Sequence, residues 1–427
     1  MAPARDAESD PARLLAQYRA GTSFYFSSPP RVLLTLGRRA DIAAMGVPAA
    51  LPAAVAGALD AAPPGSVVVG ALPFRWDLPP RLHVPAKAQW AVPLRPPRRV
   101  AAALASEAVV RAVPEPEEYE RAVREALTRL ARRDGLGKVV LARVLEVTLA
   151  RRVDSTRLLR NLAARDSHGH VFAAPLDGRT LMGASPELLV SRRGRRVTSR
   201  PLAGSAARSA DPFEDRRRAA RLLESAKDLA EHAFVVRAVR DALRPYCDRL
   251  TVPARPSLVG TATMWHLGTH VTGRLCDPPA SALALAVALH PTPAVCGTPA
   301  AAARDVIAEL EPFERGYYGG AVGWCDAEGD GDWAVAIRCA EVGDRSLRLF
   351  AGAGIVPGSD PAAELAETAA KFQTMLRALG LDDLDGRGDA TGSDPLAGRS
   401  RRAVQEGGPL ARRDPRGPAL PGRRGTW

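Results

Sequence analysis

The sequence predicts an α+β fold in which helices and β-strands are mixed along the chain. Residues 138–149 form a long stretch of mainly β-branched and aliphatic residues, which is typical of a strand. Apolar residues recur at helical spacing just before it, between Tyr119 and Leu130. The chain has 427 residues, 46% of them hydrophobic, which is enough for one large core or two fused cores.

The elements can be followed from the N-terminus. Residues 1–110, the N-terminal part of the fold, are rich in Ala and Pro and show little readable chemistry, with strand-like pieces at 31–36 and 66–72. Residues 111–380 contain nearly all recognisable chemistry and are predicted to be the catalytic domain. Further predicted elements are a helical region from Asp211-Pro212 to about Arg244 in one or two pieces, strands at 333–339 and 347–351, and a last helix from Asp360-Pro361 to about Leu379.

Residues 381–427 are predicted to be a disordered basic tail, because they are rich in Gly, Arg and Pro and poor in apolar residues. The net charge of +12 could indicate a nucleic-acid partner. However, no stripe of basic residues with interleaved aromatics is present, so scattered surface arginines and the tail are the simpler explanation. Nucleic acid is therefore not an expected partner.

Cysteine content and apolar runs predict a cytoplasmic protein. The five cysteines are odd in number and form no Cys-x-x-Cys pair, which argues against a disulfide framework or a zinc site. Residues 1–11 contain charges and no apolar core of a signal peptide. The longest apolar run, 281–289, is too short to span a bilayer, so no membrane contact is expected.

Two glycine-containing stretches do not match nucleotide-binding motifs. Residues 135–138 lack the upstream Gly and the following Ser or Thr of a P-loop. Residues 352–358 have the wrong spacing for a dinucleotide fingerprint, and Pro357 would break the helix that must follow. A glycine loop between a strand and a helix would still let backbone N–H groups approach a carboxylate, although a plain turn is an equally good interpretation.

The last predicted helix places Glu364, Glu367 and Lys371 on one face, at positions i, i+3 and i+7. In isolation, an exposed face with a Glu–Lys pair is the simpler interpretation. The alternative is a set of carboxylate ligands for a hard cation beside an ammonium for a bound anion. Glu231 and His266, each taken alone, are more typical of a solvated and a structural residue.

Taken together, however, the motifs resemble those of the chorismate-utilising enzymes. This family includes isochorismate synthases, salicylate synthases and the large subunits of anthranilate and aminodeoxychorismate synthases. The resemblance covers roughly residues 114–380 and implies an anthranilate synthase component I-like fold, with large antiparallel sheets layered with helices. The matching segments, in order, are Lys138-Val-Val-Leu-Ala-Arg143, Gly183-Ala-Ser-Pro-Glu-Leu-Leu189, Arg200-Pro-Leu-Ala-Gly-Ser205, Lys227-Asp-Leu-Ala-Glu-His232, His290-Pro-Thr-Pro-Ala-Val-Cys-Gly-Thr-Pro299, Glu314-Arg-Gly-Tyr-Tyr-Gly-Gly-Ala-Val-Gly323, Ala336-Ile-Arg338 and Ala351-Gly-Ala-Gly-Ile-Val-Pro357.

The resemblance implies chorismate, a small dianion, as substrate and Mg²⁺ as cofactor. By similarity, Glu231 and Glu367 would bind Mg²⁺, and Glu364 would do so directly or through water. A bidentate Arg suits the enolpyruvyl carboxylate. The substrate-binding residues implied by the resemblance are Arg338, Tyr318 and the backbone at Gly352 for that carboxylate, Lys371 near the ring carboxylate and metal, and Gly204, Ala294 and Val295 in the pocket wall.

The resemblance also implies an acid and a base on opposite sides of the ring. Lys138 would be the general base for an attacking water, and Glu187 the general acid for the departing ring hydroxyl. A lysine acts as a base only when neutral, a form that burial and nearby positive charge from Mg²⁺ and Arg338 would favour. Glu187 must stay protonated, which an apolar setting or a nearby carboxylate would favour.

Three positions distinguish the branches of the family. Ala203 stands where aminodeoxychorismate synthases often have Lys, and Lys138 implies water rather than ammonia as the nucleophile. Ala294 stands where salicylate synthases tend to have Thr. The resemblance is therefore to isochorismate synthases, Mg²⁺-dependent isomerases that add water at C2 of chorismate and expel the C4 hydroxyl.

Other interpretations remain open at this point. A salicylate synthase, which goes on to eliminate pyruvate, is the main alternative, followed by an anthranilate or aminodeoxychorismate synthase large subunit. A non-catalytic chorismate binder is disfavoured by the full set of acid, base and three carboxylates. No glutaminase subunit is expected if water attacks, and the sequence leaves open whether the product feeds siderophore, menaquinone or salicylate biosynthesis.

Overall fold

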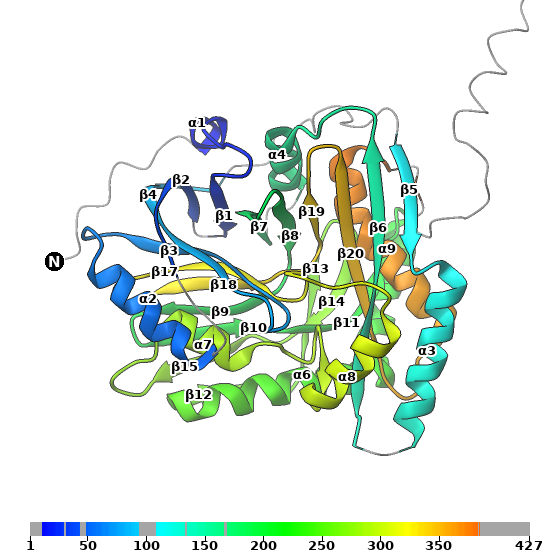
Figure 1. Ribbon diagram of the computed structural model, residues 1–427. Coiled ribbons are helices and arrows are strands. Elements are labelled where there is room, and N and C mark those ends of the chain that lie inside the picture. Colours follow the sequence, from blue (N-terminus) through cyan, green and yellow to red (C-terminus); the bar gives the residue numbers. More distant parts are fainter. Residues whose placement is uncertain are drawn as a thin grey trace, which may run out of the picture. The chain divides into compact units, whose positions relative to one another are not determined.

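The computed structural model describes residues 11–29, 31–42, 48–93, 108–132, 135–165, 169–382 and 384 (Figure 1). Most of the predicted basic tail, 385–427, therefore lies outside the described residues. At its start, Leu381 and Leu384 pack against the core. No helix among the described residues is long and apolar enough to cross a membrane.

A single antiparallel sheet of 17 strands organises the described chain. A second, three-stranded sheet consists of β11 (Leu202–Ala207), β14 (Met264–Gly268) and β13 (Ser257–Gly260), paired in that order. The large sheet pairs its strands in the order β12 (Cys247–Thr251), β15 (Val271–Leu275), β10 (Arg196–Arg200), β9 (Leu188–Arg193), β18 (Gly331–Val335), β17 (Ala321–Asp326), β3 (Val67–Leu72), β4 (Arg81–Ala91), β2 (Arg31–Asp41), β1 (Phe24–Ser28), β7 (His170–Pro175), β8 (Thr180–Ser185), β19 (Cys339–Val342), β20 (Ser346–Ile355) and β6 (Lys138–Leu149), and both β5 (Ala108–Val113) and β16 (Gly297–Thr298) pair with β6.

The large sheet bends so that its two halves enclose an aromatic-rich core. In Figure 1, β9, β17 and β18 run across the direction of β6, β19 and β20. Phe24, Phe172, Trp324 and Phe350 belong to one buried cluster between these halves. Burying such large side chains, each 1% exposed or less, supplies much of the hydrophobic stabilisation.

Helices cover the outer faces of the sheet. One apolar cluster joins the sheet to α1 (Pro11–Ala16), α4 (Ser155–Arg165) and α9 (Pro361–Leu379). A second joins it to α2 (Leu51–Asp60), α6 (Ala226–Leu243) and α7 (Ala282–Leu289), and a third to α3 (Pro116–Ala131) and α8 (Ala300–Leu310). The fold is thus a layered α+β structure, as predicted.

Several predicted elements are confirmed. β6 spans the predicted 138–149, and α9 begins after Asp360, whose side chain accepts a hydrogen bond from Ala363 N at 2.8 Å. The long helical region consists of two pieces, α5 (Pro212–Glu224) and α6. They meet at Ser225, which caps α6 by accepting a hydrogen bond from Asp228 N.

Two sequence-based predictions are wrong. The predicted strand at 333–339 is interrupted between β18 and β19, because Arg338 adopts a left-handed φ of 51°. The stretch from Gly352 is not a strand-to-helix loop, because β20 continues through Gly352 and Gly354 to Ile355. Both departures occur beside the cavity described next.

Candidate active site

The residues predicted to act on substrate or metal gather at one cavity. Its wall combines β20, β11 and β14 with α6, α9 and the loops after β8 and α7. Every predicted site residue except Lys138 and Glu364 lines it. Lys138 contacts Glu231 in the cavity wall, and Glu364 contacts Lys227 outside it. The lining residues are Val140, Pro186, Glu187, Leu202, Ala203, Gly204, Ser205, Glu231, His266, Ala294, Val295, Tyr318, Ile337, Arg338, Phe350, Ala351, Gly352, Gly354, Glu367 and Lys371.

Glu187 is a buried carboxyl that keeps its proton at neutral pH. It follows Pro186 in the short connection between β8 and β9 and is only 2% exposed. Burial raises the pKa of Glu187 to about 8, against the opposing effects of a backbone hydrogen bond from Leu202 and the charges of Lys138, Lys371 and Arg338. These opposing charges also show that Glu187 shares its surroundings with three cationic side chains.

Lys138 lies at the start of β6 and is completely buried. Its Nζ is 2.9 Å from Glu231 Oε1, which α6 contributes. Gly354 makes this ion pair possible, because a Cβ there would overlap Glu231 Oε1 and lie 2.9 Å from Lys138 Cε. The sequence-based expectation named only positive neighbours for Lys138, whereas the structure places the carboxylate of Glu231 beside its Nζ.

Two further ion pairs involve α9, one that joins it to α6 and one between residues a helical turn apart on α9 itself. Lys227 Nζ lies 2.7 Å from Glu364 Oε1, and Lys371 Nζ lies 2.6 Å from Glu367 Oε1. Lys371 also donates to Gly352 O at 2.7 Å, which ties α9 to β20. Burial and the charge of Glu367 raise the pKa of Glu364, with Lys227 opposing them. Burial alone would raise the pKa of Glu367, but Lys371 and Lys227 outweigh it and lower that pKa.

Arg338 is held by a histidine to which the sequence assigned no role. Arg338 is 4% exposed, and its guanidinium lies 3.1 Å, Nη2 to Nε2, from His266. Burial, helped by Arg338 and Lys371, lowers the pKa of His266 well below its usual range, so the neutral ring accepts the bond. In the sequence, only the His-Leu pair at 266–267, which matches the family, points to a role for His266.

Tyr318 completes this side of the cavity. Its ring stacks on Phe350 at 5.0 Å between centroids, and burial raises the pKa of its hydroxyl, which therefore stays protonated. A Cβ at Gly352 would lie 2.8 Å from that hydroxyl, so the glycine leaves room for it. A neutral hydroxyl beside Arg338 and an open backbone suit a carboxylate ligand.

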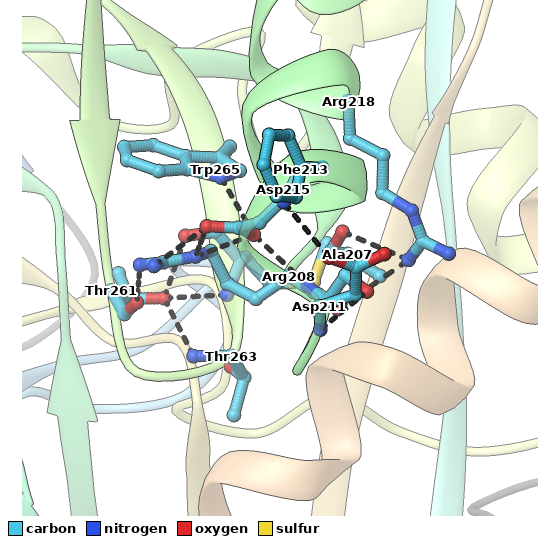
Figure 2. Close-up of polar contacts among 11 residues, drawn as sticks. Ala207, Arg208, Asp211, Phe213, Asp215, Arg218, Thr261, Thr263 and Trp265 are labelled. Atoms are coloured by element: carbon cyan, nitrogen blue, oxygen red, sulfur yellow. Dashed lines mark hydrogen bonds and ion pairs between the residues drawn. The ribbon is translucent and has the colours of Figure 1, made fainter.

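The small sheet that carries Gly204 and His266 is anchored to α5 by a carboxylate (Figure 2). Asp215 accepts hydrogen bonds from Arg208 Nε at 2.9 Å, Ser209 N at 2.9 Å and Trp265 Nε1 at 3.1 Å. These donors, Arg208 first, lower the pKa of Asp215 to about 2. Because Trp265 adjoins His266 on β14, this anchor fixes the strand that supports Arg338.

The three carboxylates suit a hard cation chemically, although each contacts a lysine. No group of three or more His, Cys, Asp or Glu side chains in the described parts of the chain is arranged to hold a metal ion. Glu231, Glu364 and Glu367 nevertheless provide oxygen ligands of the kind Mg²⁺ prefers. After burial, the charge of Glu367 is the main effect that raises the pKa of Glu364, and a shared cation would relieve this repulsion.

Comparison with known proteins finds one family and several similar sequences. The family described as chorismate binding enzyme matches residues 91–380. Isochorismate synthase DhbC of Bacillus subtilis is 50% identical over 395 residues, which is 88% of this chain and 98% of that protein. Isochorismate synthase EntC of Escherichia coli K12 is 44% identical, over 74% of this chain and 81% of that protein.

Solved structures agree with this placement. A putative 2,3-dihydroxybenzoate-specific isochorismate synthase from Bacillus anthracis, 46% identical, superposes with a TM-score of 0.82 over 87% of this chain and 99% of that one. Anthranilate synthase component I from Streptococcus pneumoniae superposes with a TM-score of 0.64 over 84% of this chain and 90% of that one. At 22% identity, the second match shows only that the fold is the same.

Proposed function

The chain belongs to the chorismate-binding enzymes, and we propose that it is an isochorismate synthase, an isomerase that converts chorismate to isochorismate. The observation that carries the proposal is the buried, protonated Glu187 in a cavity wall that also contains cationic side chains and two carboxylates, those of Glu231 and Glu367. Relatives at 44–50% identity that share most of the chain are named isochorismate synthases, which supports the same conclusion.

The reaction requires one proton to be removed and one to be supplied. Lys138, in its neutral form, takes a proton from the water that attacks C2 of chorismate. Glu187 gives its proton to the C4 hydroxyl, which leaves as water while the ring double bonds shift. One water enters and one leaves, so the net change is an isomerisation. The raised pKa of Glu187 suits a general acid, which must hold its proton at neutral pH.

Chorismate would be held through its two carboxylates. Arg338, fixed by His266, presents a planar guanidinium that pairs with the enolpyruvyl carboxylate, and the Tyr318 hydroxyl and the backbone at Gly352 assist it. Lys371 would lie near the ring carboxylate. Gly204, Ala294 and Val295 would form the wall against the ring. Because these groups are buried, bulk water does not compete with the single water molecule that attacks C2.

Mg²⁺ is the proposed cofactor, with Glu231 and Glu367 as ligands and Glu364 bound directly or through water. When bound, it would neutralise the ring carboxylate and withdraw electron density from the conjugated ring. Buried carboxylates on two helices support this assignment, since they need a cationic partner to stay ionised.

The other branches of the family have less support. Ala203 and Ala294 both line the cavity, so neither the lysine of aminodeoxychorismate synthases nor the threonine of salicylate synthases is available there. Because water is the nucleophile, no glutaminase subunit is needed. The product would feed a 2,3-dihydroxybenzoate type of pathway, since the Bacillus anthracis relative is described as specific for 2,3-dihydroxybenzoate.

Incubation of the purified full chain with chorismate and Mg²⁺, followed by chromatographic separation of products, tests the proposal. Isochorismate alone is expected. Lys138→Ala and Glu187→Gln are each expected to lower kcat by at least about 100-fold, the usual contribution of a general acid or base. The exposed Lys87→Ala and Glu117→Gln serve as matched controls with unchanged turnover. Salicylate with pyruvate, or product formation only with ammonia, would contradict the proposal.

A further inference from the structure

Lysine is rare in this chain and is concentrated at the cavity. The sequence has 59 lysines and arginines, of which only Lys87, Lys138, Lys227 and Lys371 are lysines. Lys87 is exposed on β4. Each of the other three forms an ion pair of 2.6 to 2.9 Å with one of the three carboxylates assigned above to Mg²⁺. A chain that otherwise uses arginine for positive charge thus has lysine at these positions.

Lys227 differs from Lys138 and Lys371, because the proposed reaction assigns it no role. It is the second residue of α6, where the helix dipole disfavours a cation. Its side chain is 28% exposed, whereas Glu364, its partner, is 1% exposed. Lys227 therefore neutralises Glu364 from the solvent side of that carboxylate.

We propose that Lys227 is a displaceable counter-cation of the metal site, which holds Glu364 while no metal is bound and leaves it when Mg²⁺ binds. This inference rests on the Mg²⁺ site of the proposed function. A buried carboxylate without a cation is strongly unfavourable, so the metal-free chain needs a substitute charge. An ammonium close to a divalent ion is repelled, so Mg²⁺ on Glu364 would weaken the contact between Lys227 and that carboxylate.

Lysine suits this exchange better than arginine. An ammonium is a compact charge on a flexible stem, and the partial exposure of Lys227 leaves its head a route into solvent. A guanidinium would form a bidentate pair with Glu364 and would be harder to displace. The proposal therefore predicts that charge at position 227 weakens Mg²⁺ binding while it stabilises the metal-free protein.

Titration calorimetry of the EDTA-treated full chain with MgCl₂, without chorismate, tests this prediction. Lys227→Met, which removes the competing charge, is expected to bind Mg²⁺ about tenfold more tightly than the parent, since one ion pair less must be broken. Lys227→Arg keeps the charge and should bind no more tightly than the parent. Lys87→Met, at the exposed lysine, should leave the affinity unchanged.

A second measurement uses the unaltered protein and so does not depend on the variant folding. Acetylation of Lys227 by an amine-reactive reagent, followed by mass spectrometry, should become faster when MgCl₂ is added, and acetylation of Lys87 should not change.

The two proposals can fail separately. A parent chain that binds Mg²⁺ while Lys227→Met binds it equally or more weakly, or while Lys227 labelling is unaffected by Mg²⁺, would overturn the exchange and leave the isochorismate synthase assignment intact. A parent chain and variant that both fail to bind Mg²⁺, with isochorismate formed in the presence of EDTA, would overturn the metal site and the exchange together.

Discussion

Individual residues at the cavity owe their properties to burial combined with a few specific charges. Glu187 keeps its proton because desolvation outweighs three cationic neighbours. His266 stays neutral for the same reason and therefore accepts a hydrogen bond from Arg338. The same physical effect thus provides both a proton donor and a rigid support for the cation that would bind substrate.

The pH dependence of turnover follows from Glu187. Its neutral form is the acid, and its pKa is raised to about 8, so kcat/KM should fall as the pH rises through about 8. The decline should be steady, about tenfold per pH unit well above that value. Steady-state rates with saturating Mg²⁺ in overlapping buffers would measure it. A profile that stays flat to about pH 10 would remove Glu187 as the acid.

The sequence predicted which residues gather at the cavity but not their contacts. Resemblance to a family implied roles for Lys138, Glu231, Glu364 and Glu367, and these roles stay predictions. The ion pairs join positions far apart in the sequence, on β6, α6 and α9, and no local pattern specifies which lysine meets which glutamate. Lys227 was overlooked because a lysine at a helix start is ordinarily solvated.

At the scale of elements, the wall of the cavity depends on a buried ion pair behind it. Arg315 donates to Val295 O at 2.7 Å and Val140 O at 2.8 Å, and both of those residues line the cavity. It also pairs with Glu311, which accepts from Ala142 N at 2.7 Å. One ion pair therefore joins β6 to the loop after α7 and fixes the spacing across the wall.

Removing one partner of this pair should destabilise the protein strongly. Arg315→Met leaves the Glu311 carboxylate buried without a cation and should lower the free energy of unfolding by about 3–5 kcal/mol. Urea denaturation followed by circular dichroism would measure this. The double variant Glu311→Leu with Arg315→Met should recover much of the loss, because neither charge remains. A single variant that loses less than about 1 kcal/mol would show that the pair is not structural.

Element boundaries were predictable where periodicity and capping were strong, as for β6 and α9. The predicted boundaries were wrong beside the cavity, where contacts between distant residues override the local conformational preference of the chain. A run from 333 to 339 has the composition of one strand, yet the left-handed Arg338 divides it. Glycines normally suggest a turn, yet Gly352 and Gly354 stay in β20 because Tyr318 and Glu231 fill the space their side chains would need.

At the scale of the whole molecule, the N-terminal strands belong to the same sheet as the site. β3 pairs with β17, β1 with β7 and β5 with β6, so strands before residue 114 are interleaved with later ones. We propose that residues 111–380 form the catalytic domain and that residues 1–110 complete its sheet. Composition suggested the division, but it could not reveal the pairing, because pairing between distant strands leaves no local pattern.

Truncations test this division. A chain starting at residue 111 loses β1, β3 and half of β5, which pair with β7, β17 and β6, and it should not fold cooperatively. A chain ending at Leu384 lacks most of the predicted basic tail. It should match the full chain both in its turnover of chorismate and in its retention on immobilised nucleic acid. Circular dichroism melting and rate measurements would check both. Cooperative folding of the first, or lost turnover in the second, would contradict the division.

The most direct test of the central claim is the source of the new hydroxyl oxygen. The reaction of the full chain with chorismate and Mg²⁺ is run in ¹⁸O-labelled water, and the product is analysed by mass spectrometry. Early in the reaction, one labelled oxygen at C2 of isochorismate, with no pyruvate released, is the predicted result. Isochorismate that carries no label would contradict the account, because the C4 hydroxyl would then have migrated without attack by water.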